Sequence, residues 1–230
     1  MNILMLSSSK YADHPYLGYA QGWISDILEG QKDLLFIPHA GVTVSWDAYT
    51  EKVQQALSNT NIRGIHTEKN PNQALGRANA ILIGGGNTFR LLHELYKNDL
   101  IDLIQKKIQH NTPYIGWSAG SNICGLSICT TNDMPIIEPA SFDSLKLINA
   151  QLNPHYTNYT PKGHHGETRD QRIAEFCTLN PITPVLAIPE GTALRVKGNK
   201  LSMLGSKEGY VFHGDSKQAI SSSDDLSEYL

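Results

Sequence analysis

The sequence predicts an α/β fold with a mostly parallel central sheet, helices on both of its faces and antiparallel strands at one edge. Short apolar runs alternate with amphipathic stretches through the first 120 residues, as strands and helices do in such folds. These runs are apolar throughout, which is typical of strands buried on both faces of a parallel sheet. After Gly120 the runs are shorter, and turn residues such as Gly198-Asn199 join them, which indicates antiparallel pairing.

Apolar spacing places the elements of the first half of the chain. Trp46, Tyr49, Val53 and Leu57 recur at helical spacing, and Pro38 closes the apolar run before them. The expected strands are residues 3–6, 34–37, 62–65, 80–83 and 114–116. The expected helices are residues 16–28, 46–57, 89–95 and 100–108.

The second half predicts more sheet, interrupted by one helix over residues 169–177. The polar tail from Ser221 onward is expected to fray. No repeat or linker is evident, so we expect a single domain over residues 1–230. The expected strands are residues 127–130, 145–147, 185–188, 193–196, 200–204 and 210–212.

Composition narrows the function classes. The net charge of −3 and the lack of a basic block argue against a nucleic-acid partner and against polybasic membrane attachment. The apolar runs are far shorter than a membrane span requires. Three cysteines without a CxxC pair argue against a disulfide framework or a zinc ribbon. With a first strand in place of a signal peptide, we expect a cytoplasmic protein, either a monomer or a homodimer.

The strongest local motif is Gly116-Trp117-Ser118-Ala119-Gly120, a G-x-S-x-G placed after an apolar strand. A sharp strand-to-helix turn at this motif would lift the Ser118 hydroxyl out of the sheet edge as a nucleophile. The N–H of Ala119 would then point toward the reacting centre. The alternative is a plain tight turn without chemistry.

A nucleophilic serine needs a base, and the base needs a partner that orients it. Among nine histidines, His155 follows Pro154, which restricts the local backbone, and His39 follows a strand end and could line a site. The pair His164-His165 suggests a metal, but no third ligand has suitable spacing, so we expect no metal.

Three carboxylates have settings that suit a site: Asp133, Glu138 and Glu190. Glu190 follows an apolar strand, and the carboxyl ends of strands face the crevice in which α/β proteins bind ligands. Each could instead be an acid that caps a loop.

A second glycine-rich turn, Gly84-Gly85-Gly86-Asn87-Thr88, also joins a strand to a helix. It matches neither G-x-G-x-x-G nor a P-loop, so we expect no dinucleotide or other cofactor there. An oxyanion hole suits the turn better, with one donor from Ala119 and another from Gly85 or Gly86. The alternative is a tight turn alone.

Together these motifs resemble the aspartyl dipeptidases of the peptidase E family, which are serine peptidases. The matching segments are 37–43, 83–89, 116–121, 130–135, 153–155 and 189–191, and the match runs to about Gly214. The resemblance implies a fold like that of class I glutamine amidotransferases, which is flavodoxin-like, and no cofactor. It also implies hydrolysis of dipeptides with N-terminal aspartate through an acyl-enzyme.

By that resemblance, Ser118 matches the nucleophile and His155 the base. Both Asp133 and Glu190 match acids that have been assigned to the triad; we expect Glu190 to orient His155, and Asp133 to hold the substrate ammonium. His39 stands where the family has tyrosine, and this could alter a pocket wall.

An aspartyl substrate requires a cation or several donors beside its side chain. Arg169 is the first candidate and Arg172 the second, because a guanidinium offers two parallel donors to a carboxylate. Asn87, in the glycine-rich turn, is a further candidate for substrate binding. A salt bridge from Arg169 to Asp170 or Glu167 is the structural alternative. The competing functions are another serine hydrolase, such as a cyanophycinase-like peptidase or an esterase, and a non-catalytic ligand-binding domain.

Overall fold

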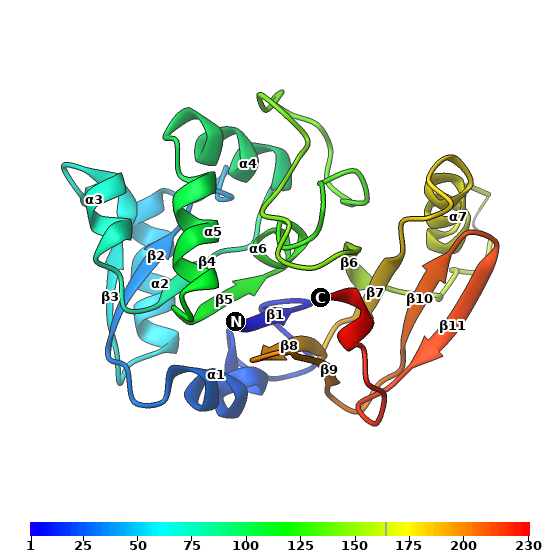
Figure 1. The fold of residues 1–230 in the computed structure, drawn as a ribbon, viewed down its shortest axis with the longest axis horizontal. Coiled ribbons are helices and arrows are strands. Elements are labelled where there is room, and N and C mark those ends of the chain that lie inside the picture. The colour runs from blue at the N-terminus through cyan, green and yellow to red at the C-terminus, as the bar shows by residue number, and fades with distance from the viewer. Residues whose placement is uncertain (164) are drawn as a thin grey trace.

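The computed structural model describes residues 1–163 and 165–230, and these residues form two β-sheets with helices around them (Figure 1). The larger sheet has seven strands in the order β3-β2-β4-β5-β1-β8-β9. The first five are parallel, while β8 pairs antiparallel with β1, and β9 with β8. Their bounds are β1 Asn2–Leu6, β2 Asp33–Ile37, β3 Asn61–Gly64, β4 Ile81–Ile83, β5 Tyr114–Trp117, β8 Ala193–Lys197 and β9 Lys200–Leu204.

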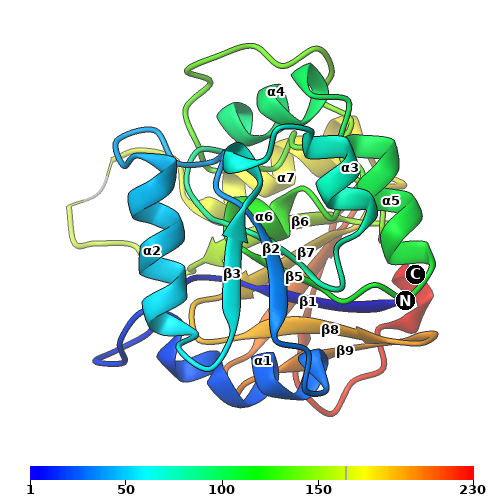
Figure 2. The ribbon, with the colours of Figure 1, turned by 90° about the vertical axis from the view of Figure 1, so that its left-hand side faces the viewer.

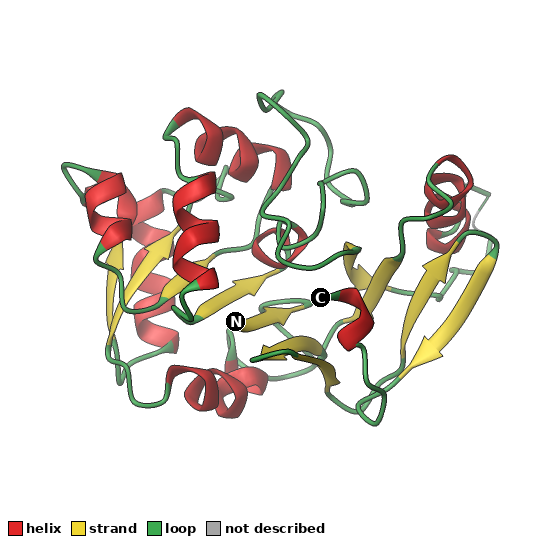
Figure 3. Cartoon of the chain, viewed as in Figure 1, coloured by secondary structure: helices red, strands yellow, loops and turns green. Residues whose placement is uncertain are grey.

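The smaller sheet has four strands in the order β11-β10-β7-β6. Strands β6 and β7 are parallel, and β10 pairs antiparallel with both β7 and β11. The bounds are β6 Gln151–Tyr156, β7 Val185–Pro189, β10 Gly209–His213 and β11 Ser216–Ile220. This sheet lies beside the larger one, at the end of the molecule that carries α7 (Figure 3).

Helices cover both faces of the larger sheet, because side chains of its strands alternate between two apolar cores. On β1, Ile3 and Met5 belong to one core, and Leu4 and Leu6 to the other. Figure 2 shows α2 on one side of β2 and β3, and α3 with α5 on the other. The helix bounds are α1 Gln21–Leu28, α2 Trp46–Ala56, α3 Pro71–Gly76, α4 Thr88–Lys97, α5 Ile101–Gln109, α6 Ala119–Asn122 and α7 Arg169–Leu179; short 3-10 turns occupy Gly18–Ala20, Ile65–Thr67 and Ser227–Tyr229.

The predicted α/β class, with its parallel sheet, covering helices and antiparallel edge, is confirmed. Two predicted strands, residues 127–130 and 145–147, are wrong, because this region is loop and forms an isolated bridge between Ser127 and Asp143. Its backbone N–H groups find scattered partners that form no ladder: Leu145 donates to the carbonyl of Ile123, and Ser127 donates to the side chain of Gln151.

Strands β6 and β11 and the short helix α3 were not expected from the sequence. The predicted fraying of the tail is also wrong. Leu226 is buried and donates its N–H to the carbonyl of Leu201, and the Asn149 side chain donates to the carbonyl of Leu230. The longest helices among residues 1–163 and 165–230 have eleven residues, and none could cross a membrane.

Candidate active site

The loop after β5 holds Ser118 in a strained turn. Its backbone lies at φ 53° and ψ −112°, a conformation that costs a non-glycine residue energy and is often found at functional sites. A Cβ on Gly116 would lie 2.3 Å from the carbonyl oxygen of Gly120, and a Cβ on Gly120 would lie 2.2 Å from that of Ile83. Both glycines of G-x-S-x-G are therefore required for the turn to form.

His155 and Glu190 reach Ser118 from the smaller sheet. His155 lies near the end of β6, and its Nε2 is 3.0 Å from Ser118 Oγ. Its Nδ1 is 2.7 Å from Oε1 of Glu190, the residue that follows β7. The three side chains form one hydrogen-bonded chain in which the carboxylate fixes the orientation of the imidazole.

Ser7 forms hydrogen bonds between the two sheets next to His155. It follows β1 of the larger sheet and is fully buried. Its Oγ accepts the N–H of His155 and donates to the carbonyl of Ile188, both at 2.9 Å, while its N–H donates to the carbonyl of Thr192 at 3.0 Å. The Ser7 hydroxyl therefore fixes the position of the His155 backbone relative to the end of β1 in the larger sheet.

The glycine-rich turn between β4 and α4 lies against Ser118. A Cβ on Gly85 would be 3.0 Å from Cβ of Ser118, and Gly86, at φ +139°, lies so close to the carbonyl of Ala40 that a side chain would clash. The N–H groups of Gly85, Gly86 and Ala119 find no acceptor in the described part of the chain. These donors are available to a negative charge beside Ser118.

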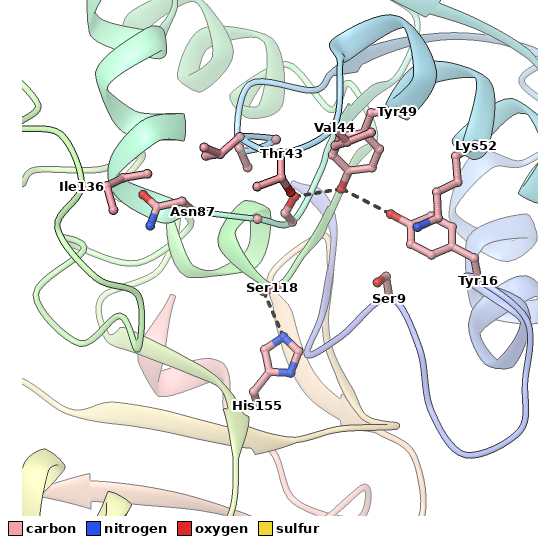
Figure 4. Close-up of a pocket in the computed structure, with 15 residues that line it drawn as sticks. Ser9, Tyr16, Thr43, Val44, Tyr49, Lys52, Asn87, Ser118, Ile136 and His155 are labelled. Atoms are coloured by element: carbon pink, nitrogen blue, oxygen red, sulfur yellow. Dashed lines mark hydrogen bonds between the residues drawn. The ribbon is translucent and has the colours of Figure 1, made fainter.

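Two cavities meet at Ser118 and His155. The larger, about 500 Å³, lies between the glycine-rich turn, the loop over residues 40–44 and helix α2, and it includes Lys52 (Figure 4). The smaller, about 240 Å³, extends the other way and includes Asp133 and Arg169. A substrate bond placed at Ser118 would thus have one half in each cavity.

In the smaller cavity Asp133 does not contact His155. Its Oδ2 accepts hydrogen bonds from the N–H and the hydroxyl of Thr88, at 2.7 and 2.6 Å, and from the hydroxyl of Thr131 at 3.3 Å. Its Oδ1 has no partner among the residues described. Asp133, which lines the cavity, thus anchors the start of α4 with one oxygen and leaves the other without a partner among the described residues.

Arg169, the first residue of α7, is the cation of that cavity. Its Nη1 is 3.4 Å from Oδ1 of Asn153, and burial together with the neighbouring Arg172 lowers its pKa. The alternative salt bridges are not formed, because Asp170 pairs with Lys217 and Glu167 with Arg172. Arg172 is exposed beside Glu167.

His39 and Asn87 occupy different positions. His39 is buried against the ring of Trp46, with 4.6 Å between the ring centroids, while its neighbour Ala40 lines the larger cavity. Burial and the neighbouring His66 lower the pKa of His39 to about 4, so its imidazole is neutral at pH 7. Asn87 lines the larger cavity, and its amide caps α4 and donates to the carbonyl of Met134.

The residues that the structure describes contain no group of three potential metal ligands. His164, of the pair considered for a metal, lies outside these residues. Glu138, the third carboxylate considered, is exposed.

Sequence reasoning did not find Ser7, Lys52 or the role of Tyr49 in the site. Ser7 follows the first apolar run, so the sequence places it at the end of a strand. The sequence does not show that its side chain contacts His155 and Ile188. Helical spacing places Tyr49 on one side of a helix with Val53 and Leu57, and its ring is buried, but periodicity does not say where the hydroxyl points.

Comparison with known proteins places this geometry in a family. The model of peptidase family S51 matches residues 3–204. The chain belongs to peptidase family S51. It is 52% identical to peptidase E of Shewanella denitrificans over all of this chain and 99% of that protein, and 52% identical to peptidase E of Shewanella amazonensis over the full length of both.

Two solved structures share the fold of this chain. The crystal structure of a putative peptidase E from Listeria monocytogenes matches with a TM-score of 0.69 at 26% identity, covering 90% of this chain and 98% of that one. A peptidase from an acI-B1 actinobacterium shares the fold, with a TM-score of 0.70 at 17% identity over 98% and 96% of the two chains. The predicted resemblance to peptidase E is confirmed, and the chain is a serine-type peptidase.

Proposed function

We propose that this S51 peptidase hydrolyses dipeptides with an N-terminal aspartate through an acyl-enzyme on Ser118. The observation that carries the proposal is the Ser118–His155–Glu190 hydrogen-bonded chain, placed where a cavity with an arginine meets a second cavity. A serine and its base within hydrogen-bond reach, with the base oriented by a carboxylate, suit acyl transfer.

In the first step, Ser118 Oγ attacks the carbonyl carbon of the aspartyl residue, and its proton passes to Nε2 of His155. Glu190 holds Nδ1–H of His155, so Nε2 is the basic nitrogen and the imidazolium that forms is stabilised. The carbonyl oxygen becomes an oxyanion beside the N–H groups of Ala119 and the glycine-rich turn. Preorganised donors of this kind are each worth about 10²–10³ in turnover.

In the second step, the C–N bond breaks and His155 gives its proton to the leaving amine. Water then attacks the acyl-enzyme, with His155 again taking a proton, and aspartate and Ser118 are released. Removal of Ser118 from such a unit costs on the order of 10⁶ in turnover.

The smaller cavity suits the aspartyl residue. The guanidinium of Arg169 can donate two parallel hydrogen bonds to the side-chain carboxylate, and its partial burial strengthens the pair. The open Oδ1 of Asp133 can accept from the substrate ammonium, which would require a free N-terminus. Asp133 therefore acts in substrate binding in this proposal, and Glu190 acts on His155.

The larger cavity suits the leaving residue. The apolar side chains of Val42, Val44 and Ile136 line it, and their exposed fractions of 38–55% are high for such residues. Lys52 lies over the ring of Tyr16 at the same cavity and is a cation for the carboxylate of the leaving amino acid.

The test is hydrolysis of Asp-Leu, Asn-Leu, Ala-Leu and acetyl-Asp-Leu by wild type, Ser118→Ala and Arg169→Ala. We expect wild type to cleave Asp-Leu alone and Ser118→Ala to lose on the order of 10⁶ of that activity. Arg169→Ala should hydrolyse Asp-Leu about 30-fold or more slowly than wild type, since removal of the guanidinium leaves the desolvated substrate carboxylate unpaired.

Arg172→Ala is the matched control, because Arg172 is on the same turn of α7 and is paired outside the cavity with Glu167. Cleavage of esters but no peptide by folded wild type would contradict the proposal. Asp-Leu hydrolysis that is unchanged in Arg169→Ala, or reduced equally in Arg169→Ala and Arg172→Ala, would remove Arg169 as the residue that recognises aspartate.

A further inference from the structure

Tyr49, on α2, has every hydrogen-bonding position of its hydroxyl used. The ring is buried and packs edge-on against Phe36, with 5.1 Å between centroids. Its Oη lies 3.3 Å from the hydroxyl of Tyr16 (Figure 4) and 2.9 Å from the carbonyl oxygen of Gly85. Nε1 of Trp117 lies 3.0 Å from the same oxygen.

The direction of these bonds is determined by their chemistry. An indole N–H can only donate, so Trp117 donates to the phenol oxygen and cannot receive its proton. Tyr16 donates to the same oxygen, and the single proton of Tyr49 goes to the carbonyl of Gly85. Burial raises the pKa of Tyr49, so the phenol keeps this proton across the neutral range.

A hydrogen bond to the Gly85 carbonyl orients the whole peptide between Gly85 and Gly86. In a trans peptide the C=O and the following N–H point in opposite directions, so the N–H of Gly86 points away from Tyr49. The surroundings of the turn agree with this: a Cβ on Gly84 would lie 2.6 Å from Oη of Tyr49, whereas a Cβ on Gly85 would meet Ser118.

We propose that Tyr49 is a positioning residue of the oxyanion hole, which holds the Gly85–Gly86 peptide so that the N–H of Gly86 faces the oxyanion formed at Ser118. This rests on the proposed function and sharpens it, because it selects Gly86 over Gly85 as the second donor beside Ala119. Glycine at φ +139° has little intrinsic preference for this conformation, so the peptide needs an outside contact to hold its orientation.

The variant Tyr49→Phe removes the hydroxyl and keeps the ring against Phe36. We expect kcat for Asp-Leu to fall about tenfold and KM to stay within twofold, because a donor that turns away loses part of the 10²–10³ that a fixed donor supplies. Tyr96→Phe is the matched control, since the Tyr96 hydroxyl also donates to a backbone carbonyl, that of Asp143, outside both cavities. Its kcat should stay within twofold of wild type.

Two ligands separate positioning from a structural defect. An aspartate analogue with a boronic acid in place of the α-carboxyl forms a tetrahedral adduct with Ser118 that occupies the oxyanion hole, whereas aspartate itself does not form an adduct. Tyr49→Phe should raise the inhibition constant of the boronate about tenfold and that of aspartate less than twofold. The ratio of the two inhibition constants does not depend on how much of the preparation is folded.

If Tyr49→Phe cannot be purified, Trp117→Phe removes the donor that directs the Tyr49 proton and should weaken the boronate by about two- to fivefold relative to aspartate. Unchanged kcat in Tyr49→Phe, or equal weakening of boronate and aspartate in either variant, would overturn the role of Tyr49. Failure of wild type to hydrolyse Asp-Leu would contradict the proposed function instead, and is seen before any variant is compared.

Discussion

The two sheets supply the candidate site in different ways. The larger sheet contributes Ser118 through local geometry: an apolar strand, two glycines that no other residue can replace, and a turn into α6. The smaller sheet contributes His155 and Glu190 only through the position of β6 and β7 relative to that strand. The position of Ser118 is thus specified over five residues, whereas the positions of His155 and Glu190 depend on how two sheets are joined.

Ser7, at the end of β1, hydrogen-bonds to His155 and to Ile188 of the smaller sheet, so its replacement tests this comparison most severely. Ser7→Ala leaves the N–H of His155 and the carbonyl of Ile188 unpaired and frees the imidazole from the end of β1. We expect kcat for Asp-Leu to fall about 10- to 100-fold, because displacement of a catalytic group by about 1 Å has this effect.

Ser144→Ala is the control for Ser7→Ala. Ser144 is also a buried serine whose hydroxyl donates to a backbone carbonyl, but it lies in the loop after α6 and its bond, to Gly125, stays within that loop. Similar stability losses in both variants with a loss of kcat in Ser7→Ala alone are expected. Full activity of Ser7→Ala would show that the sheets hold their relative position without this contact.

The cations of the two cavities also come from different layers. Lys52 is on α2, which packs on the larger sheet, and Arg169 begins α7, which packs on the smaller one. Lys52→Met should lower kcat/KM for Asp-Leu about fivefold and leave Asp-Leu-amide unchanged, because an exposed ion pair with the substrate carboxylate is worth up to about 1 kcal/mol.

Lys106→Met, an exposed lysine on α5 away from both cavities, is the control for Lys52→Met. An equal loss for the acid and the amide would mean that Lys52 does not contact the leaving carboxylate.

His39 is expected to affect stability and not catalysis, since it is buried behind the cavity wall. Its folded pKa of about 4 lies below the ordinary value of 6.5, so below pH 6.5 the unfolded chain binds a proton that the folded chain does not. Stability is therefore present above pH 6.5 and is lost as the pH falls toward 4, by about 2 kcal/mol between pH 7 and pH 5.

The measurement for His39 is urea denaturation at pH 7 and pH 5 of wild type and His39→Tyr. The variant should lose less stability over this interval and keep kcat within twofold. An identical pH dependence in the two proteins would show that His39 is not the group responsible.

The same difference between the sheets explains what the sequence could predict. The inner parallel strands of the larger sheet are apolar runs, such as residues 80–83, that are buried on both faces, so composition reveals them. Strand β6 contains Gln151, Asn153 and Pro154, and it is irregular where it pairs with β7, so its pattern resembles a loop. Residues 127–130 and 145–147 have buried apolar side chains, which suggested strands, but their backbone hydrogen bonds go to scattered loop residues and form only an isolated bridge.

For the site, motif and strand position together pointed to Ser118, and resemblance to a family pointed to His155 and Glu190. The roles of Ser7 and Tyr49 could not be predicted, because each depends on a hydroxyl reaching a segment that is distant in the sequence. Ser7 bonds His155 across 148 positions, and Tyr49 bonds Gly85 across 36.

The proposed mechanism requires residues from the two sheets to act as one catalytic unit. The most direct test compares kcat for Asp-Leu in His155→Ala, Glu190→Gln and the double variant. Groups that act together give strongly non-additive losses, and an orienting carboxylate replaced by its amide costs about 10⁴ in turnover. We expect kcat of the double variant to be no lower than that of His155→Ala. Losses that multiply would show that Glu190 acts independently of His155 and would contradict a single catalytic unit.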